Sequence, residues 1–351
     1  MIKTDIIIIG AGPAGLFAVF EAGLLKLRCH LIDILPNPGG QCSELYPKKP
    51  IYDIPGHPEI LAGDLVENLL NQCSQFQPGF TLGESAEKIS KNSKGLFTVV
   101  TDKGTTHQAP VVAIAGGLGG FHPRKPLINN IESYEEKGVS YFVKDPSVYK
   151  NKNVLISGGG DSALDWTIEL ANIASNVTLI HRRNEFRGAM DSVEKVQKLK
   201  NKNKIDLITP AEVVSLSGDD KLKSVEIKIK NSENITLNVD YFIPLFGLTP
   251  KLGPIKNWGL EIEKKSIKVD NTLSYQTNVP GIFAIGDINT YPGKLKLILC
   301  GFHEAAMMCR SAYKIINPDK KLVLQYTTVS GVSGFDGSIK KAQPTVRKSI
   351  D

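Results

Sequence analysis

Residues 4–23 have the sequence TDIIIIGAGPAGLFAVFEAG, in which an apolar run passes through a glycine-rich turn into a second apolar stretch. The four isoleucines at 6–9 are typical of a parallel strand that is covered on both faces. The turn at 10–15 matches the pattern Gly-x-Gly-x-x-Gly, with an expected strand before it and an expected helix after it. The chain is therefore predicted to begin with a strand–turn–helix unit that binds a dinucleotide.

Each glycine of this turn has a separate role in such a unit. Gly10 permits the tight turn, Gly12 lets the backbone approach a pyrophosphate, and Gly15 allows the helix to pack closely on the strand. The helix N-terminus then stabilises the phosphate charge through its free N–H groups and its dipole. At the end of the next expected strand, Asp33 can accept hydrogen bonds from ribose hydroxyls. The residues assigned to this turn are Gly10, Gly12, Pro13, Ala14 and Gly15.

A second segment, 153–172, repeats the pattern with the sequence NVLISGGGDSALDWTIELAN. Its turn has the form Gly-x-Gly-x-x-Ala, which is a permitted variant. A short strand is expected after each helix, and the spacing agrees, since 33 − 15 and 181 − 163 are both 18 positions. The chain thus carries two βαβ nucleotide-binding units. The residues assigned to the second turn are Gly158, Gly160, Asp161, Ser162 and Ala163.

The two units differ at the end of their second strands. Where the first has Asp33, the second has the sequence HRRNEFR at 181–187. A carboxylate there would repel the 2′-phosphate of NADPH, whereas arginine binds phosphate through paired hydrogen bonds. We therefore expect the second unit to bind NADPH rather than NADH. The residues assigned to it are Arg182, Arg183 and Arg187, with His181 stacking or assisting.

A third motif, AIGD at 284–287, follows both nucleotide motifs and precedes the helix-like sequence CGFHEAAMMCRSAYKII at 300–316. Gly286 allows a close approach, and Asp287 is the kind of carboxylate that binds the ribityl chain or the pyrophosphate side of a flavin. The N-terminus of the following helix could face the pyrimidine edge of the flavin and stabilise its reduced form.

Composition limits the class of protein. A chain of 351 residues, 41% hydrophobic and 22% charged, is typical of a soluble globular protein of two domains. No apolar run reaches the roughly 18–20 residues of a membrane span, and the N-terminus lacks the features of a secretory signal. We expect a cytoplasmic protein without membrane association. The formal net charge of +6 favours acidic partners. The lysine-rich runs at 195–204 and 264–268 suit either solvated surfaces or a docking patch, and no basic–aromatic pattern indicates nucleic-acid binding.

The five cysteines form no Cys-x-x-Cys pair, and their spacing fits neither a disulfide framework nor a zinc site. Buried thiols in a reducing compartment are the expected interpretation, and no metal site is predicted. The cysteines are Cys29, Cys42, Cys73, Cys300 and Cys309.

Two glycine- and proline-rich segments, 116–126 and 244–250, are the expected crossings between domains. They predict one discontinuous domain, 1–117 with 248–351, and one inserted domain, 118–247. The fold class expected is α/β, with two Rossmann-like nucleotide-binding domains of three layers (ββα).

Four stretches resemble the thioredoxin-reductase-like flavoproteins in their order and spacing, and the resemblance covers nearly the whole chain. They are GAGPAG at 10–15, GGGDSALDW at 158–166, HRRNEFR at 181–187 and AIGD at 284–287. That resemblance implies that the discontinuous domain binds FAD and that the inserted domain binds NADPH. In thioredoxin reductase the inserted domain carries a Cys-x-x-Cys after a stretch like Gly-Val-Ser-Tyr. Here residues 138–145 are GVSYFVKD, with neither cysteine, so a dithiol–disulfide relay cannot operate.

What remains resembles the thioredoxin-reductase-like ferredoxin–NADP⁺ reductases, the type without an active-site disulfide. The resemblance implies a loop around FAD formed by Gln41 and Tyr46, and a C-terminal segment, 325–331, that covers the flavin. Either Tyr46 or the tail would supply the aromatic side chain stacked on the flavin. The FAD-binding residues carried over from the family are Asp33, Gln41, Tyr46, Ala86, Phe121, Gly286, Asp287 and Thr328.

We therefore expect an FAD-containing ferredoxin–NADP⁺ oxidoreductase, a homodimer by resemblance, with ferredoxin or flavodoxin as its partner. No protein side chain is expected to act as a catalytic acid or base, because the flavin carries the chemistry. Two alternatives stay open at this point. One is an NADPH-dependent flavin reductase of a small molecule such as a quinone. The other is a non-catalytic nucleotide-binding module.

Overall fold

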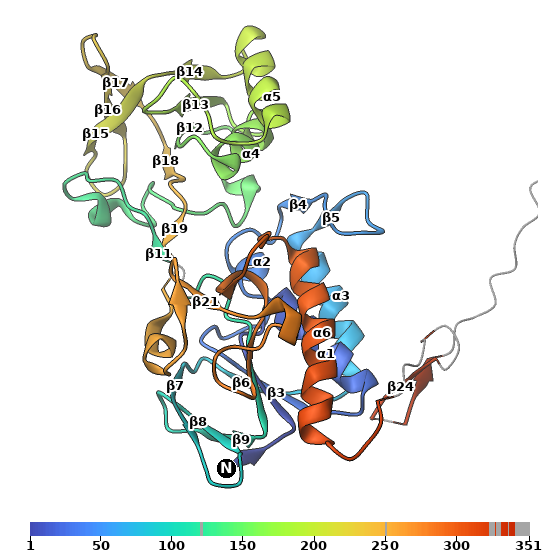
Figure 1. Cartoon of the computed structure of the whole chain (residues 1–351). Coiled ribbons are helices and arrows are strands. Elements are labelled where there is room, and N and C mark those ends of the chain that lie inside the picture. The colour runs from blue at the N-terminus through green and yellow to red at the C-terminus, as the bar shows by residue number, and fades with distance from the viewer. Residues whose placement is uncertain (120–121, 250, 323–326, 328–330, 336, 341–351) are drawn as a thin grey trace, which may run out of the picture. The chain divides into compact units, whose positions relative to one another are not determined.

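The computed structural model describes residues 1–119, 122–249, 251–322, 327, 331–335 and 337–340. The chain divides into two compact units (Figure 1): Met1–Gly120 with Pro250–Asp351, and Phe121–Thr249. The second unit is thus an insertion within the first. The sequence-based boundaries, after residues 117 and 247, lie three and two residues before these divisions.

The first unit is built on a five-stranded parallel sheet with the order β22-β10-β2-β3-β6. Its centre is almost entirely apolar, because β2 and β10 are buried along their whole length. The strands are β2 (Ile6–Ile9), β3 (Cys29–Asp33), β6 (Gly79–Leu82), β10 (Val111–Ile114) and β22 (Ile282–Ala284).

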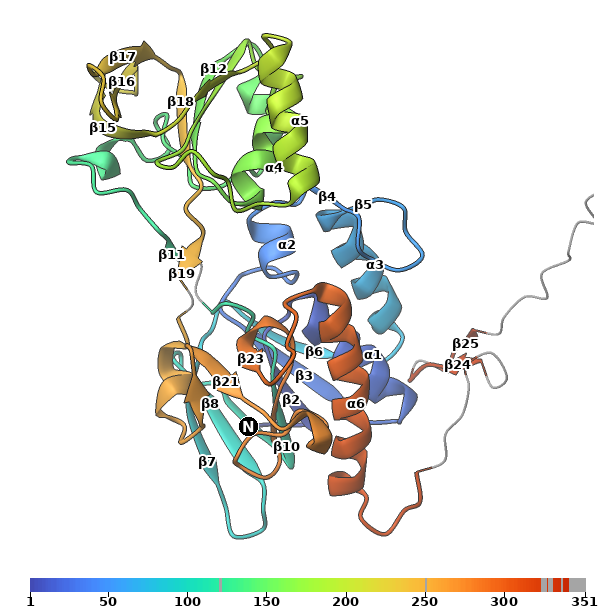
Figure 2. The same cartoon turned by 45° about the horizontal axis from the view of Figure 1, so that its top comes forward.

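Two further layers cover this sheet. Figures 1 and 2 show three helices side by side on one face and a four-stranded sheet, β1-β9-β8-β7, on the other. This is the ββα arrangement expected from the sequence. The helices are α1 (Pro13–Leu24), α3 (Ala62–Ser74) and α6 (Ile298–Ile316); the strands are β1 (Ile2–Lys3), β7 (Ala86–Lys91), β8 (Phe97–Thr101) and β9 (Thr106–Ala109).

The second unit repeats the plan on a smaller scale. Its parallel sheet has the order β14-β13-β12-β18, and a three-stranded antiparallel sheet, β15-β16-β17, accompanies it. The elements are β12 (Asn153–Ser157), α4 (Asp161–Leu170), β13 (Asn176–Ile180), α5 (Met190–Asn201), β14 (Asp206–Ile208), β15 (Ala211–Ser217), β16 (Ser224–Ile229), β17 (Ile235–Asn238) and β18 (Tyr241–Pro244).

Short elements complete the described part of the chain. At the crossings, β11 (His122–Pro123) pairs antiparallel with β19 (Leu248–Thr249). The others are α2 (Gln41–Glu44), β4 (Pro50–Ile51), β5 (Ile60–Leu61), β20 (Ile262–Glu263), β21 (Ser266–Lys268), β23 (Asn289–Thr290), β24 (Val332–Ser333), β25 (Ile339–Lys340) and five 3₁₀ turns: η1 (Ile131–Tyr134), η2 (Pro146–Tyr149), η3 (Gly253–Asn257), η4 (Asn271–Leu273) and η5 (Gly286–Ile288).

The described part of the C-terminal tail is held against the end of α3. The backbone N–H of Phe335 donates to the carbonyl of Gln75 at 2.8 Å, and the ring of Phe335 lies 5.6 Å from that of Phe76. The Arg28 guanidinium lies 5.0 Å from the same ring. Aromatic and cation–π contacts therefore anchor the segment that follows the tail sequence singled out above.

A buried chain of polar side chains connects the two sheets of the first unit. His30 Nε2 on β3 and Thr81 Oγ1 on β6 share a hydrogen bond of 2.8 Å, and Thr81 Oγ1 shares a second, of 2.9 Å, with His107 Nε2 on β9. Burial, with His107 beside it, lowers the pKa of His30 to about 4, and burial also lowers the pKa of His107. Both imidazoles are therefore uncharged in the folded protein at neutral pH.

The hydrogen-bonded chain of His30, Thr81 and His107 predicts that the folded protein loses stability in acid. In the unfolded state histidine titrates near pH 6.5. The free energy of unfolding should therefore be constant above about pH 6.5 and fall as the pH approaches 4. The loss is about 2–3 kcal/mol from His30. Urea denaturation at a series of pH values measures it. His30→Gln should flatten this dependence, whereas the exposed His57→Gln should not. An equal slope in all three proteins would contradict the prediction.

Candidate cofactor sites

The first glycine turn leaves no room for a side chain at two of its positions. Gly10 has φ +109°, and a Cβ added there would lie 2.4 Å from the carbonyl oxygen of Ala115, the residue directly after the neighbouring strand β10. A Cβ on Gly15 would lie 2.1 Å from the carbonyl oxygen of Gly10. The turn therefore packs against β10, and α1 packs against the turn, as the sequence predicts for these two glycines.

Gly12 differs from these two because space lies in front of it. It caps the N-terminus of α1, and a Cβ there would meet only the Cα of Gly40, at 3.9 Å. No side chain caps this helix and its first turn holds no acid, while Pro13 occupies the first position without removing a needed donor. An uncapped helix N-terminus with open space before it suits a phosphate group. The turn thus fits a dinucleotide.

Asp33 fixes the shape of this turn. Its carboxylate accepts a hydrogen bond from the backbone N–H of Ala11 at 2.6 Å and another from Leu35 at 2.9 Å. Burial raises the pKa of Asp33, and the two backbone hydrogen bonds oppose that rise. Each oxygen keeps a lone pair for a ribose hydroxyl. The sequence did not predict the contact with Ala11, which makes Asp33 part of the turn as well as a ligand candidate.

Two further predicted FAD residues lie against the same turn. The N–H of Glu84 donates to the carbonyl of Asp33 at 3.1 Å, which brings the start of β7, and with it buried Ala86, beside the strand end. On the other side, the N–H of Gly39 donates to the carbonyl of Ala11 at 2.8 Å. Gln41 begins α2 directly after this contact. The structure therefore gathers Ala86 and Gln41 around the glycine turn.

Tyr46 and Asp287, which are 241 positions apart (287 − 46), share one environment. The hydroxyl of Tyr46 and the thiol of Cys42 share a hydrogen bond, and the carboxylate of Asp287 acts on the pKa values of both. Burial raises the pKa of Cys42 to about 11, so the thiol stays protonated. The predicted aromatic and carboxylate partners of the flavin therefore lie together, and Cys42 is an additional member that the sequence did not reveal.

Gly286 and Asp287 lie where the first turns of α1 and α6 meet. Gly286 has φ +74°, and a Cβ there would lie 3.3 Å from the Cβ of Ala14. A Cβ on Gly301 of α6 would lie 3.2 Å from the same atom and 3.4 Å from the Cα of Gly286. Burial raises the pKa of Asp287, and Lys296 opposes the rise. Glycine at these two positions, with the small Ala14 opposite, lets two helix N-termini and the Gly–Asp turn converge.

Glu304 on α6 was not predicted, although it is fully buried directly behind this turn. Its Oε2 accepts hydrogen bonds from the N–H of Gly286 at 2.7 Å and from Asn289 Nδ2 at 2.8 Å. Its Oε1 accepts from the hydroxyl of Tyr291 at 2.8 Å and from Lys294 Nζ at 2.5 Å. The available signal was the single acid within the apolar sequence at 300–316.

The second glycine turn has the same division of roles. A Cβ on Gly158 would lie 2.7 Å from the carbonyl oxygen of Leu245 and 2.8 Å from the Cβ of Ala163. Gly160 caps α4, and no atom lies within 4 Å of the position its Cβ would take. Ser162 is exposed in the first turn of the helix. This turn also fits a dinucleotide phosphate.

Asp161 has a structural role in addition to the one predicted for it. Its Oδ1 accepts a hydrogen bond from the backbone N–H of Ala189 at 2.7 Å, and the N–H of Arg187 donates to the carbonyl of Gly159 at 2.7 Å. These two bonds hold the arginine-bearing loop against the glycine turn. The structure therefore makes Asp161 a support of this loop, and its contact with a nucleotide stays a prediction.

His181 lies against the second turn in the position that an acid has in the first. A Cβ on Gly159 would lie 2.4 Å from its Nε2, and its ring stacks on Phe186 with centroids 5.4 Å apart. Burial lowers the pKa of His181, and the charges of Arg182, Arg187 and Arg183 lower it further. The neutral ring leaves its buried Nε2 without a hydrogen-bond partner. Phe186 was not predicted to contribute.

The three arginines that follow are exposed, and the structure pairs none of them with a carboxylate of the described residues. Their guanidinium groups are therefore available to a phosphate beside α4. Two predicted FAD residues, Phe121 and Thr328, lie outside the described residues.

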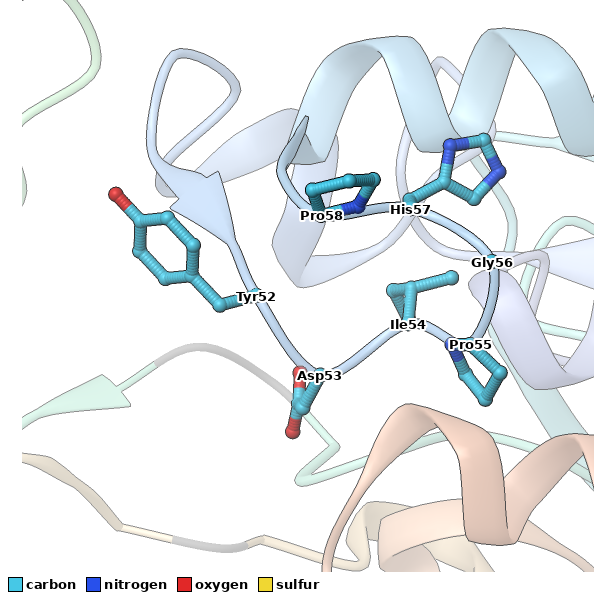
Figure 3. Close-up of a pocket in the computed structure, with 7 residues that line it drawn as sticks. All are labelled: Tyr52, Asp53, Ile54, Pro55, Gly56, His57 and Pro58. Carbon is cyan, nitrogen blue, oxygen red and sulfur yellow. The ribbon is translucent and has the colours of Figure 1, made fainter.

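An open pocket of about 520 Å³ lies elsewhere on the first unit, within the loop between β4 and β5 (Figure 3). None of the predicted site residues lines it. Its lining residues are Tyr52, Asp53, Ile54, Pro55, Gly56, His57 and Pro58. Among the described residues no three His, Cys, Asp or Glu side chains cluster as metal ligands, and no described helix has the length and apolarity to span a membrane.

The fold and the two glycine turns define the class of protein, a two-nucleotide oxidoreductase. A family model described as pyridine nucleotide-disulphide oxidoreductase matches residues 4–307. The chain therefore belongs to this family.

Individual proteins and solved structures give closer resemblances than the family model does. A protein named ferredoxin–NADP reductase from Flavobacterium johnsoniae is 69% identical over the full length of both chains, and one from Parvibaculum lavamentivorans is 52% identical over 94% of this chain and 96% of its own. Among solved structures, thioredoxin reductase from Lactococcus lactis has a TM-score of 0.76 at 27% identity, covering 90% of this chain and 100% of that chain. The thioredoxin-reductase-like fold and the resemblance to ferredoxin–NADP reductases are confirmed.

Substitution of Gly12 or of Gly160, the two glycines with open space before them, should weaken the binding of different nucleotides. Gly12 and Gly160 have backbone angles that alanine also adopts, and each has space for the methyl group that Gly12→Ala or Gly160→Ala would add. Both proteins should fold. Gly12→Ala should weaken FAD binding at least about tenfold, a change of 1.4 kcal/mol or more, because the methyl group occupies the phosphate position. Gly160→Ala should weaken only NADPH binding. Fluorescence titrations with each nucleotide measure both, and unchanged affinities would contradict the assignment.

Proposed function

We propose that this protein is a ferredoxin–NADP⁺ oxidoreductase that holds FAD in the first unit and NADPH in the second. Two complete glycine turns, each before an uncapped helix N-terminus, carry this conclusion, because a binding module would need only one. FAD bound by these residues would supply the redox chemistry, namely hydride acceptance from NADPH and single-electron exchange with ferredoxin. The full-length relatives of the same family bear the name ferredoxin–NADP reductase.

The first unit would bind FAD through elements that meet at one edge of the sheet. The N-terminus of α1 would receive the pyrophosphate, with Asp33 accepting from the ribose and Asp287 from the ribityl side. Tyr46, whose hydroxyl is occupied by Cys42, would present its ring to the flavin. Apart from the flavin itself no group needs to donate or remove a proton. The protein supplies orientation and a fixed electrostatic environment.

The second unit would select NADPH by charge. His181 occupies the place of the ribose acid, and the neutral imidazole does not repel a 2′-phosphate. Arg182 and Arg183 follow it directly, and the loop that carries them is fixed to the glycine turn by Asp161. Charge-assisted hydrogen bonds to a phosphate are among the stronger polar contacts in proteins.

The chain has no dithiol with which to pass electrons onward. Its five cysteines form no Cys-x-x-Cys pair, and four of them are buried. Electrons would therefore leave the flavin directly, to a one-electron protein carrier. We extend the proposal to flavodoxin as an alternative carrier, to a homodimer, and to a cytoplasmic location. The net charge of +6 would attract an acidic carrier.

The experiment is anaerobic reduction of cytochrome c by the FAD-loaded protein and NADPH, with and without ferredoxin. A large ferredoxin-dependent increase in rate, reduced by salt, supports the proposal. Flavin reduction without any gain from ferredoxin or flavodoxin would indicate a reductase of small molecules. No flavin reduction by NADPH or NADH would leave only a binding module.

Nucleotide selectivity gives a second test. Arg182→Ala and Arg183→Ala should each raise the KM for NADPH by about tenfold or more, the equivalent of one charge-assisted hydrogen bond. The KM for NADH should stay within about twofold, because NADH has no 2′-phosphate. Lys230→Ala, at an exposed lysine of the same unit, is the matched control. Equal effects on the two nucleotides would show that the arginines do not read the 2′-phosphate.

A further inference from the structure

Behind the Gly286–Asp287 turn lies a buried cluster of five groups, which we name the Glu304 cluster: Glu304, the N–H of Gly286, Asn289, Tyr291 and Lys294. Glu304 and Asn289 are fully buried, and the side chain of Lys294 is 6% exposed. Both carboxylate oxygens of Glu304 accept two hydrogen bonds each. A buried carboxylate that accepts four hydrogen bonds is held rigidly, and it holds each of its partners in place.

Two of these contacts reach the predicted flavin site through the backbone. The bond from Gly286 fixes the residue directly before Asp287, and Asn289 Nδ2 bridges Glu304 to the carbonyl of Ala284, each at 2.8 Å. The turn is therefore held on both sides of Asp287 by one side chain of α6. Gly301, in the first turn of that helix, packs against the same Gly286.

The cluster also sets the local charge. Lys294 Nζ lies 2.5 Å from Glu304 Oε1, so the buried cation is paired with a buried anion. Asp287 responds to both, since Lys294 lowers its pKa and Glu304 raises it. At short range within protein these charges act strongly on one another and on any group beside Asp287.

We propose that Glu304 is a positioning residue for FAD: it fixes the Gly286–Asp287 turn and neutralises Lys294, and thereby sets both the affinity for FAD and the midpoint potential of the bound flavin. The inference rests on the proposed placement of FAD in the first unit. It assigns no contact between Glu304 and the cofactor. Its two consequences, geometric and electrostatic, are separable by substitution.

The experiment compares four full-length proteins: wild type, Glu304→Gln, Lys294→Met and the double variant. FAD affinity is measured by fluorescence titration of the apoprotein, and the midpoint potential of the holoprotein by equilibration with a reference dye. Glu304→Gln should lose at least tenfold in FAD affinity. Removal of the anion should shift the potential to more positive values, because uncompensated Lys294 favours the electron-rich cofactor.

Lys294→Met should shift the potential in the opposite direction. A tenfold change in the relative affinity for reduced and oxidised FAD corresponds to about 30 mV for a two-electron couple. The double variant removes both charges, so its potential should return to the wild-type value while its FAD affinity stays weakened. Glu261→Gln is the matched control, because Glu261 belongs to an exposed ion pair with Lys268 of the same unit.

Each outcome decides the proposal. Shifts of the same sign in the two single variants, or wild-type affinity and potential in Glu304→Gln, would overturn it, even if the melting temperature falls. Glu304→Gln leaves a buried cation unpaired and is strongly destabilised. If it does not fold, the uncharged double variant decides alone, and wild-type FAD affinity there would refute the positioning role. A wild-type protein that binds no FAD would refute the proposed function instead.

Discussion

The contact of the first glycine turn with the residue that follows strand β10 is the constraint on which the rest of the first unit depends. Gly10 approaches Ala115 so closely that no side chain fits, and Gly15 approaches Gly10 in the same way. These contacts place the N-terminus of α1 at the edge of the sheet. Asp33 then holds Ala11 from the next strand. Every other predicted FAD residue that the structure describes is gathered around this turn.

The second unit repeats the same construction with a different residue at the strand end. Gly158 packs on Leu245 and Ala163, and Gly160 leaves the helix N-terminus open. At the strand end, however, a neutral histidine stacked on Phe186 replaces the carboxylate. One backbone plan is therefore repeated with a carboxylate at the end of β3 and an uncharged imidazole directly after β13, and this difference underlies the proposal that the two units take different nucleotides.

The sequence predicted the features that a local pattern of residues determines. The glycine spacing, the strand-end residues and the Gly–Asp motif each occupy consecutive positions, so their backbone roles can be read directly. It did not predict contacts between distant side chains. The predicted turn residue Asp161 also accepts a hydrogen bond from Ala189, 28 positions away, which the sequence did not reveal. Glu304 acts on Gly286 across 18 positions, and His30 reaches His107 through Thr81. Such pairings depend on packing, which no motif encodes.

The central claim is that electrons pass from NADPH to the flavin and leave it without a cysteine relay. Anaerobic rapid mixing of the FAD-loaded protein tests it in a single turnover. In the first mixing, NADPH should bleach the visible absorption band of the flavin. In the second mixing, oxidised ferredoxin should restore that band. The rate of this reoxidation should be the same in untreated protein and in protein whose accessible thiols have all been alkylated. Loss of reoxidation on alkylation, with bleaching intact, would contradict the claim and place a thiol in the path.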